Sequence, residues 1–211
     1  MILLLLNLPG LKLGANGLPY PIPIHPQLVH LTLGLLIIAV IFDIAGTLFP
    51  LGRPIFKFLA LPAIRAGFYE VGWYNLLGAA IITFFTVAVG FFELMLATPP
   101  TDRVSGWGLD AKSTMLLHGL GGIALLATIA GMALWRGAQR YRWRKDRLRE
   151  VQWSYLLVGV VLLGALYLHG TLGAQLGDEF GIHNTAVHQL RQGGNSTHEL
   201  PSGQEYGLFN K

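Results

Sequence analysis

Four long stretches of the chain carry almost no charge, and they restrict the fold more than any other feature. They cover residues 27–49, 71–97, 111–135 and 151–176. Each exceeds the roughly 20 residues that an α-helix needs to cross about 30 Å of hydrocarbon. Because lipid offers the backbone no hydrogen-bond partners, each stretch must satisfy its own amide groups, which makes it a helix. The sequence therefore predicts an all-α fold, an integral membrane bundle of four helices.

Composition supports this class and narrows the chemistry. Of 211 residues, 53% are hydrophobic and only 12% are charged, whereas a soluble domain usually carries about 25% charged residues. Cysteine is absent, which excludes disulfides, thiolate metal sites and covalently attached c-type haem. The seven histidines are the strong nitrogen ligands that remain.

We divide the chain into three parts. Residues 1–23 form an N-terminal segment at the membrane interface, 24–177 the four-helix domain, and 178–211 a polar tail. The opening MILLLL is too short to span and has no basic residues before it, so we expect an uncleaved segment and no signal peptide. The tail holds His183, His188 and His198, which we interpret as solvated or as lying on a partner.

Basic residues gather in two of the three loops and predict the orientation. The loop between the first two helices contains Arg53, Lys57 and Arg65. The loop before the fourth helix contains Arg136, Arg140, Arg142, Arg144, Lys145, Arg147 and Arg149. The positive-inside rule places both loops in the cytoplasm, so both termini lie on the outer side of a bacterial inner membrane. Contact with anionic lipid accompanies such a loop, and nothing indicates nucleic-acid binding.

With this topology, histidines from three helices share one layer near the outer face. His30, His118 and His169 differ in depth by only about 6 Å at 1.5 Å per residue, and the cytoplasmic half has none. His25 stands at the mouth of the first helix, before Pro26 in its first turn. Five residues rotate a helix by about 140°, so His25 and His30 cannot share a face. We expect His30 in the core and His25 at the rim or in a second site.

Three roles are open for this layer, because ionisable groups inside a membrane indicate function by default. Paired imidazoles can ligate one or two b-type haems between facing helices. The histidines can instead bond across helices in a structural role. They can also hold a chlorophyll-type pigment, copper or a quinone headgroup.

Neighbouring residues bear on these roles. Gly122 and Gly173 lie four residues after His118 and His169, where they leave room for a flat macrocycle or for close helix packing. Glu93 lies near the layer and can orient an imidazole or relay a proton from a quinol. For Asp43 we expect a place at the headgroups or a pairing with basic loop residues.

The start of the first helix, H-P-Q-L-V-H-L-T-L-G-L-L followed by Asp43, resembles the H-P-x-x-V-H-F-P-I-A-L-L…D opening of a bacterial membrane family, domain of unknown function 2231. G-A-Q-L-G-D-E-F-G-I at the end of the fourth helix is similar to that family's G-G-x-L-V-Y-x-x-G-V. Here Asp178 replaces the tyrosine, and Leu31-Thr32 replaces Phe-Pro. The resemblance covers about residues 24–184 and implies a small membrane protein that is either of cytochrome b type or associated with redox proteins.

Together these features predict a b-type cytochrome-like electron-transfer subunit of a larger redox or photosynthetic complex. It would exchange electrons with membrane quinone and a periplasmic partner. The sequence contains no nucleophile–base pair or phosphate loop, so we expect no catalytic activity of its own. The alternative is a non-redox scaffold or a pigment-binding subunit.

Overall fold

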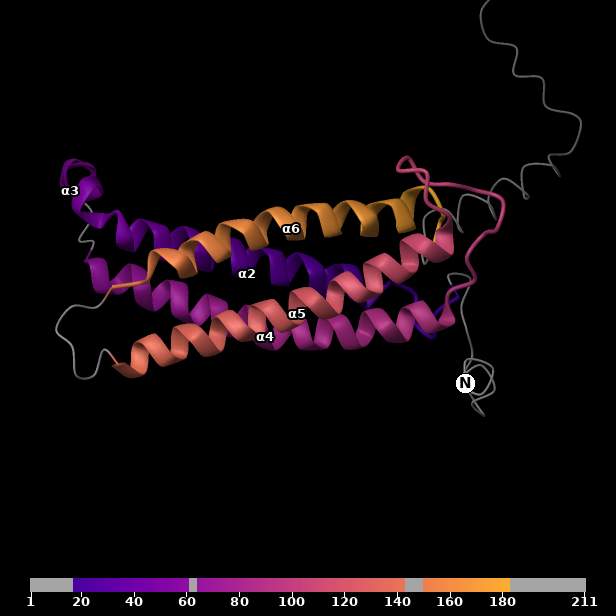
Figure 1. Ribbon diagram of the computed structural model, residues 1–211, viewed down its shortest axis with the longest axis horizontal. Coiled ribbons are helices and arrows are strands. Elements are labelled where there is room, and N and C mark those ends of the chain that lie inside the picture. The colour runs from indigo at the N-terminus through magenta and orange to yellow at the C-terminus, as the bar shows by residue number, and fades with distance from the viewer. Residues whose placement is uncertain (1–16, 61–63, 143–149, 183–211) are drawn as a thin grey trace, which may run out of the picture.

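The protein is described by a computed structural model, which covers residues 17–60, 64–142 and 150–182. In these ranges the chain forms five helices and no β-strand. The helices are α2 (Ile24–Thr47), α3 (Phe49–Phe58), α4 (Arg65–Leu96), α5 (Ala111–Arg142) and α6 (Trp153–Asp178). All but the short α3 are long and apolar enough to cross a membrane, and these four lie side by side (Figure 1). The predicted all-α fold with four spans is confirmed.

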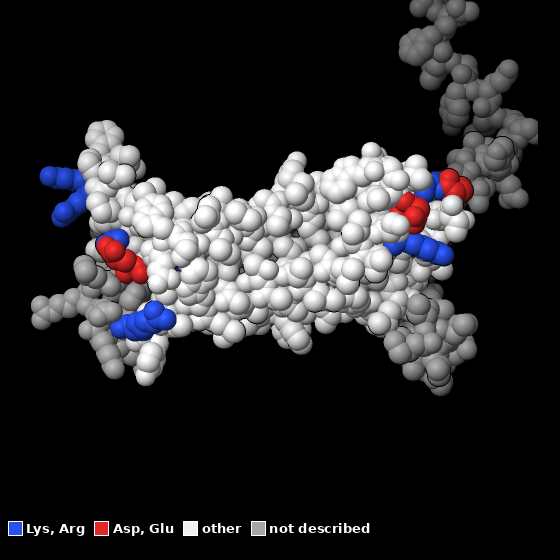
Figure 2. Space-filling view, in the orientation of Figure 1, with Lys and Arg blue, Asp and Glu red and all other residues white. Residues whose placement is uncertain are grey.

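The two ends of the bundle differ in their side chains, and we name them accordingly. The histidine end contains the starts of α2 and α5 and the ends of α4 and α6. The basic end contains α3, the starts of α4 and α6, and the end of α5 (Figure 1). Charged side chains gather at both ends, and the surface between them is uncharged in the view of Figure 2. This uncharged band matches a membrane-spanning region.

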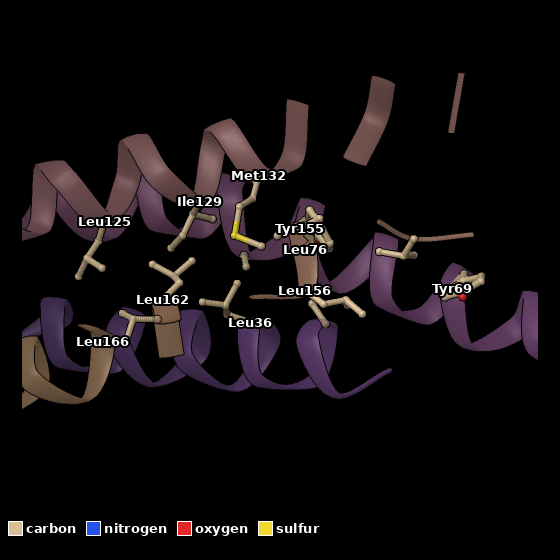
Figure 3. Packing of buried hydrophobic residues seen from close by; sticks show 13 residues of the cluster. Leu36, Tyr69, Leu76, Leu125, Ile129, Met132, Tyr155, Leu156, Leu162 and Leu166 are labelled. Carbon is tan, nitrogen blue, oxygen red and sulfur yellow. The ribbon is translucent and has the colours of Figure 1, made fainter. Parts of the chain in front are cut away.

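The bundle is held by an apolar core along its length. Leu36, Leu76 and Ile129 are fully buried between the helices (Figure 3). The main partner of α2 is α4, and α5 closes the bundle between α4 and α6. Many large apolar side chains instead face outward, for example Phe84 and Val161. Such exposure suits lipid, because lipid tails are as apolar as the side chains.

Two spanning helices extend further than predicted at the basic end. The helix expected over 111–135 continues to Arg142, and the one expected over 71–97 begins at Arg65. Arg140 binds Glu70 through two hydrogen bonds of 2.9 and 2.8 Å, so these extra turns pair with each other. The placement of Arg136, Arg140 and Arg142 in a loop is wrong, because all three belong to α5. The same holds for Arg65, the first residue of α4, and for Arg53 and Lys57, which belong to α3.

The start of α5 is fixed by its own sequence. Asp110 precedes the helix and accepts hydrogen bonds from the backbone N–H and the hydroxyl of Ser113, at 2.9 and 2.8 Å. This is an N-cap, which satisfies an amide that the helix leaves unpaired. These bonds lower the pKa of the Asp110 carboxyl. Two residues earlier Gly108 has φ of +75°, which glycine adopts without strain.

Residues 17–23, the described part of the N-terminal segment, pack against the histidine end. Leu18 is fully buried, and the Tyr20 hydroxyl donates a 2.8 Å hydrogen bond to Glu93 of α4. This part of the predicted interfacial segment therefore rests on the bundle. MILLLL lies outside the described residues.

Candidate functional site: an imidazole-lined cavity

A cavity of about 400 Å³ opens inside the histidine end. All four spanning helices line it, and its walls include all four histidines predicted as a site, namely His25, His30, His118 and His169. Small-molecule sites usually measure about 300–1,000 Å³ and combine apolar walls with a few polar groups. The cavity meets this description, so it is the candidate functional site.

Three of the imidazole rings form a continuous cluster. His118 of α5 and His169 of α6 are stacked, with ring centroids 4.2 Å apart and ring planes within 6°. His25 of α2 lies edge to face with His118, at 5.9 Å between centroids and 89° between planes. The predicted layer therefore exists, with His25 as its representative from α2.

The placement of the α2 pair differs from the prediction. His30 is exposed, whereas His25 is half-buried and contacts His118. The expectation that His30 enters the core and His25 stays at the rim is wrong. The physical reason is the rotation of α2, which begins at Ile24 and turns the His25 side chain towards α4 and α5.

Each of the three clustered imidazoles lies against a glycine of a neighbouring helix. A methyl group on Gly90 of α4 would come within 2.6 Å of His25, and one on Gly121 of α5 within 2.7 Å of His169. A methyl group on Gly173 of α6 would approach His118 to 3.0 Å. A side chain larger than hydrogen at these glycines would displace the rings. The glycines therefore position the imidazoles.

The sequence interpretation of the glycines is corrected by this arrangement. Gly173 was expected to leave room beside His169 on the same helix, but it receives His118 from across the interface. A methyl group on Gly122 would lie 3.9 Å from His169, in ordinary contact, so its neighbour Gly121 makes the close approach. The space left by Gly90, Gly121 and Gly173 is filled by imidazole rings.

The protonation of His25 follows from its hydrogen bond. Its Nδ1 lies 2.9 Å from the backbone oxygen of Thr86. A carbonyl can only accept, so Nδ1 carries the proton and donates it. In the neutral ring Nε2 then presents its lone pair, which is the arrangement that most metal-binding histidines use.

His118 is the most enclosed of the imidazoles. It is 9% exposed, and its Nδ1 has no hydrogen-bond partner among the described residues. A buried polar atom without a partner destabilises a structure by about 1–3 kcal/mol. Because His118 also lines the cavity, its imidazole is a candidate group for binding a ligand.

Glu93 has a role that the sequence reasoning missed. Its buried carboxylate accepts hydrogen bonds from the backbone N–H groups of Ile24 and His25, at 2.9 and 3.1 Å, besides the bond from Tyr20. Pro23 offers no side-chain cap to α2. Glu93 of α4 therefore caps α2 in its place, which fixes the backbone that carries His25. The sequence did offer a signal for this cap. The start of the first helix has no capping side chain, and the acidic Glu93 lies at the same depth.

Asp43 belongs to a separate cluster at the basic end. Its carboxylate and the Arg136 guanidinium are both fully buried and joined by bonds of 2.9 and 3.2 Å. The guanidinium lies over the rings of Tyr69 and Tyr155. The expected pairing with a basic residue is therefore observed, but inside the bundle and not at the headgroups. A buried pair of this kind can impose a unique packing of the helices.

No group of three or more His, Asp or Glu side chains within the described ranges is arranged to hold a bare metal ion. A haem differs in its requirement, because the porphyrin supplies four nitrogens and the protein only one or two axial ligands. His183, His188 and His198 lie outside the described residues.

The arrangement can now be compared with known proteins. The model of a family described as predicted membrane proteins, DUF2231, matches residues 21–186. The chain belongs to the DUF2231 family. The resemblance drawn from the sequence is thus confirmed at the level of the family. The matched range contains all four membrane-spanning helices and the residues that line the cavity. No curated protein and no solved structure matches the chain.

Proposed function

We propose that this DUF2231 protein is a b-type cytochrome-like electron-transfer subunit that holds haem in the imidazole cavity. His25 and His118 would hold it through their imidazole nitrogens. The carrying observation is their spacing of 5.9 Å between ring centroids. Imidazole nitrogens bind metals at about 2 Å, so centroids about 6 Å apart leave room for one metal ion between two imidazoles. The present contact is edge to face, so ligation would require one ring to turn its nitrogen edge towards the other.

The same criterion separates the candidate pairs. His118 and His169 are stacked face to face at 4.2 Å, which leaves no gap for a macrocycle between them. Of the two ring contacts, only that between His25 and His118 has the spacing for one shared metal ion. We therefore assign His169 to supporting the His118 ring, and we propose a single haem.

The surrounding residues would prepare His25 as a ligand. The Thr86 carbonyl holds the Nδ1 proton, Gly90 sets the ring position, and Glu93 fixes the start of α2. A bound haem would supply reversible one-electron transfer, and the apolar walls would restrict water. We further propose a bacterial inner membrane with the histidine end outward, facing a periplasmic partner and membrane quinone.

A non-redox role is the second candidate, and a specific observation favours it. The imidazoles fill the space beside Gly90, Gly121 and Gly173 of neighbouring helices, which we call glycine notches. Histidines that only pack the bundle would do the same. In that case the protein is a scaffold or a pigment-binding subunit of a membrane complex.

An absorption spectrum tests the proposal. The protein is produced with ample haem and purified, and its absorption spectrum is recorded in the oxidised state and after reduction with dithionite. We expect a reduced α-band in the b-type region. His25→Ala and His118→Ala should each abolish or shift it, whereas His30→Ala should leave it unchanged because His30 is exposed and outside the ring cluster.

Two results would contradict the assignment in different ways. A wild-type protein without any b-type band rejects haem, and reduced thermal stability of His118→Ala would then support the scaffold role. A normal band in both His25→Ala and His118→Ala keeps haem but refutes this ligand pair.

A further inference from the structure

Helix α3 at the basic end has three distinct faces. Phe49 and Phe56 face the bundle, where their rings stack at 5.6 Å and Phe56 lies 5.3 Å from Phe68 of α4. Leu51, Ile55 and Phe58 lie on another face at spacings of four and three residues and are 61–87% exposed. Spacings of three and four place side chains on one side of a helix, so these three form a continuous apolar strip.

The third face is basic. Arg53 and Lys57 are one helical turn apart and both are exposed. Neither forms an ion pair with any residue in the described part of the chain. An apolar strip beside unpaired cations is typical of a helix that lies in the membrane–water interface.

A cleft of about 400 Å³ adjoins the start of α3. Pro50, Arg65 and Trp153 are among its lining residues. Trp153 is 68% exposed, and tryptophan is enriched at the level of lipid headgroups. The Arg65 guanidinium is fixed there by hydrogen bonds to the Gly46 carbonyl and to Glu150. The cleft thus offers space and an aromatic ring at the start of the helix that carries the unpaired cations, and the charge of Glu150, which also lines it, is balanced by Arg65.

We propose that α3 and this cleft form a binding site for an anionic phospholipid. The apolar strip would contact acyl chains, Arg53 and Lys57 would bind the phosphate, and the cleft would accept the rest of the headgroup. Only a lipid presents hydrocarbon and a phosphate together at the level where the spans end. The site lies at the opposite end from the imidazole cavity, so it is independent of the proposed haem.

Native mass spectrometry of the detergent-solubilised full chain provides the test. The protein is titrated with phosphatidylglycerol and, separately, with phosphatidylcholine of the same acyl chains. We expect tighter binding of phosphatidylglycerol. Arg53→Gln with Lys57→Gln should weaken it about fivefold per charge removed, from the usual contribution of a basic residue near an anionic surface.

Matched variants make the result specific. Arg103→Gln with Lys112→Gln removes two charges from the histidine end, where both residues are exposed, and should leave the lipid affinity unchanged. Arg53→Lys with Lys57→Arg keeps both charges and should retain binding. Thermal midpoints equal to that of the wild type establish that the variants are folded.

Three outcomes would overturn the proposal. They are equal binding of the two lipids by the wild type, equal weakening by the variant at the histidine end, and displacement of phosphatidylglycerol by millimolar inorganic phosphate. The last outcome would identify a site for free phosphate in place of a lipid.

Discussion

Both ends of the bundle bury ionisable side chains, but they satisfy them in opposite ways. At the basic end Asp43 and Arg136 close directly on each other and are fully buried. At the histidine end His25, His118 and His169 surround a cavity, and the Nδ1 of His118 has no partner among the described residues. Polar groups that satisfy one another stabilise the fold, whereas polar groups left around an open space are available to a ligand. The comparison therefore supports the proposal that the functional site lies at the histidine end.

Breaking the pair at the basic end should have the largest effect. Asp43→Asn leaves the buried Arg136 without its counter-charge, and such a loss typically destabilises a protein by about 3–5 kcal/mol. Chemical or thermal unfolding in detergent measures the change.

Glu70→Gln is the matched control, because the Glu70–Arg140 pair has similar bonds but is partly exposed. We expect a change below about 1 kcal/mol there. Equal losses in the two variants would refute the assignment of a stabilising role to the buried pair.

An intermediate effect is expected from filling a glycine notch at the histidine end. Gly90→Ala places a methyl group 2.6 Å from His25, and overpacking of this kind destabilises by about 1–3 kcal/mol. If the proposed haem is bound, the same change should weaken or shift its absorption band by moving the ring.

Gly131→Ala on α5 provides the comparison, because a methyl group there meets nothing within 4 Å. It should keep the spectrum and keep or slightly raise stability, since alanine favours helices. A Gly90→Ala protein indistinguishable from Gly131→Ala would show that the notch does not position His25.

The smallest effect should come from the segment that rests on the histidine end. Tyr20→Phe removes the hydrogen bond to Glu93, worth about 0.5–1.5 kcal/mol. Burial and, secondly, this bond raise the pKa of the Tyr20 hydroxyl. The protonated form is thus favoured in the folded protein, so its stabilisation is present below pH 10 and is lost as the pH rises through the raised pKa.

Thermal midpoints measured from pH 8 to 11 test this dependence. The difference in thermal midpoint between the wild type and Tyr20→Phe should stay constant up to about pH 10 and begin to shrink above it. A constant difference across the range would exclude ionisation of Tyr20 as the cause.

The sequence predicted the spans well because hydropathy is a local property. The histidine layer was also predictable, since depth along a helix follows from counting residues. The face of α2 that turns inward could not be predicted, because the rotation of the helix depends on its packing against α4. For this reason His25, and not the expected His30, joins the imidazole cluster.

The remaining errors involve contacts between segments far apart in the chain. Arg136 was placed in a loop because its partner Asp43 is 93 residues away, and nothing local to Arg136 indicates a buried position. Gly121 was missed because its contact, His169, comes from another helix. Helix α3 could have been found from the spacing of Leu51, Ile55 and Phe58, but the sequence analysis treated this segment only as a basic loop.

The cap that Glu93 provides to α2 has a consequence for biosynthesis. The amides of Ile24 and His25 emerge from the ribosome 69 and 68 residues ahead of the carboxylate that binds them. If the helices insert as they are synthesised, α2 enters the bilayer before the residue that caps its first turn exists. The histidine end can acquire its final form only after α4 has followed, so any cofactor would be loaded after insertion of the α2–α4 pair.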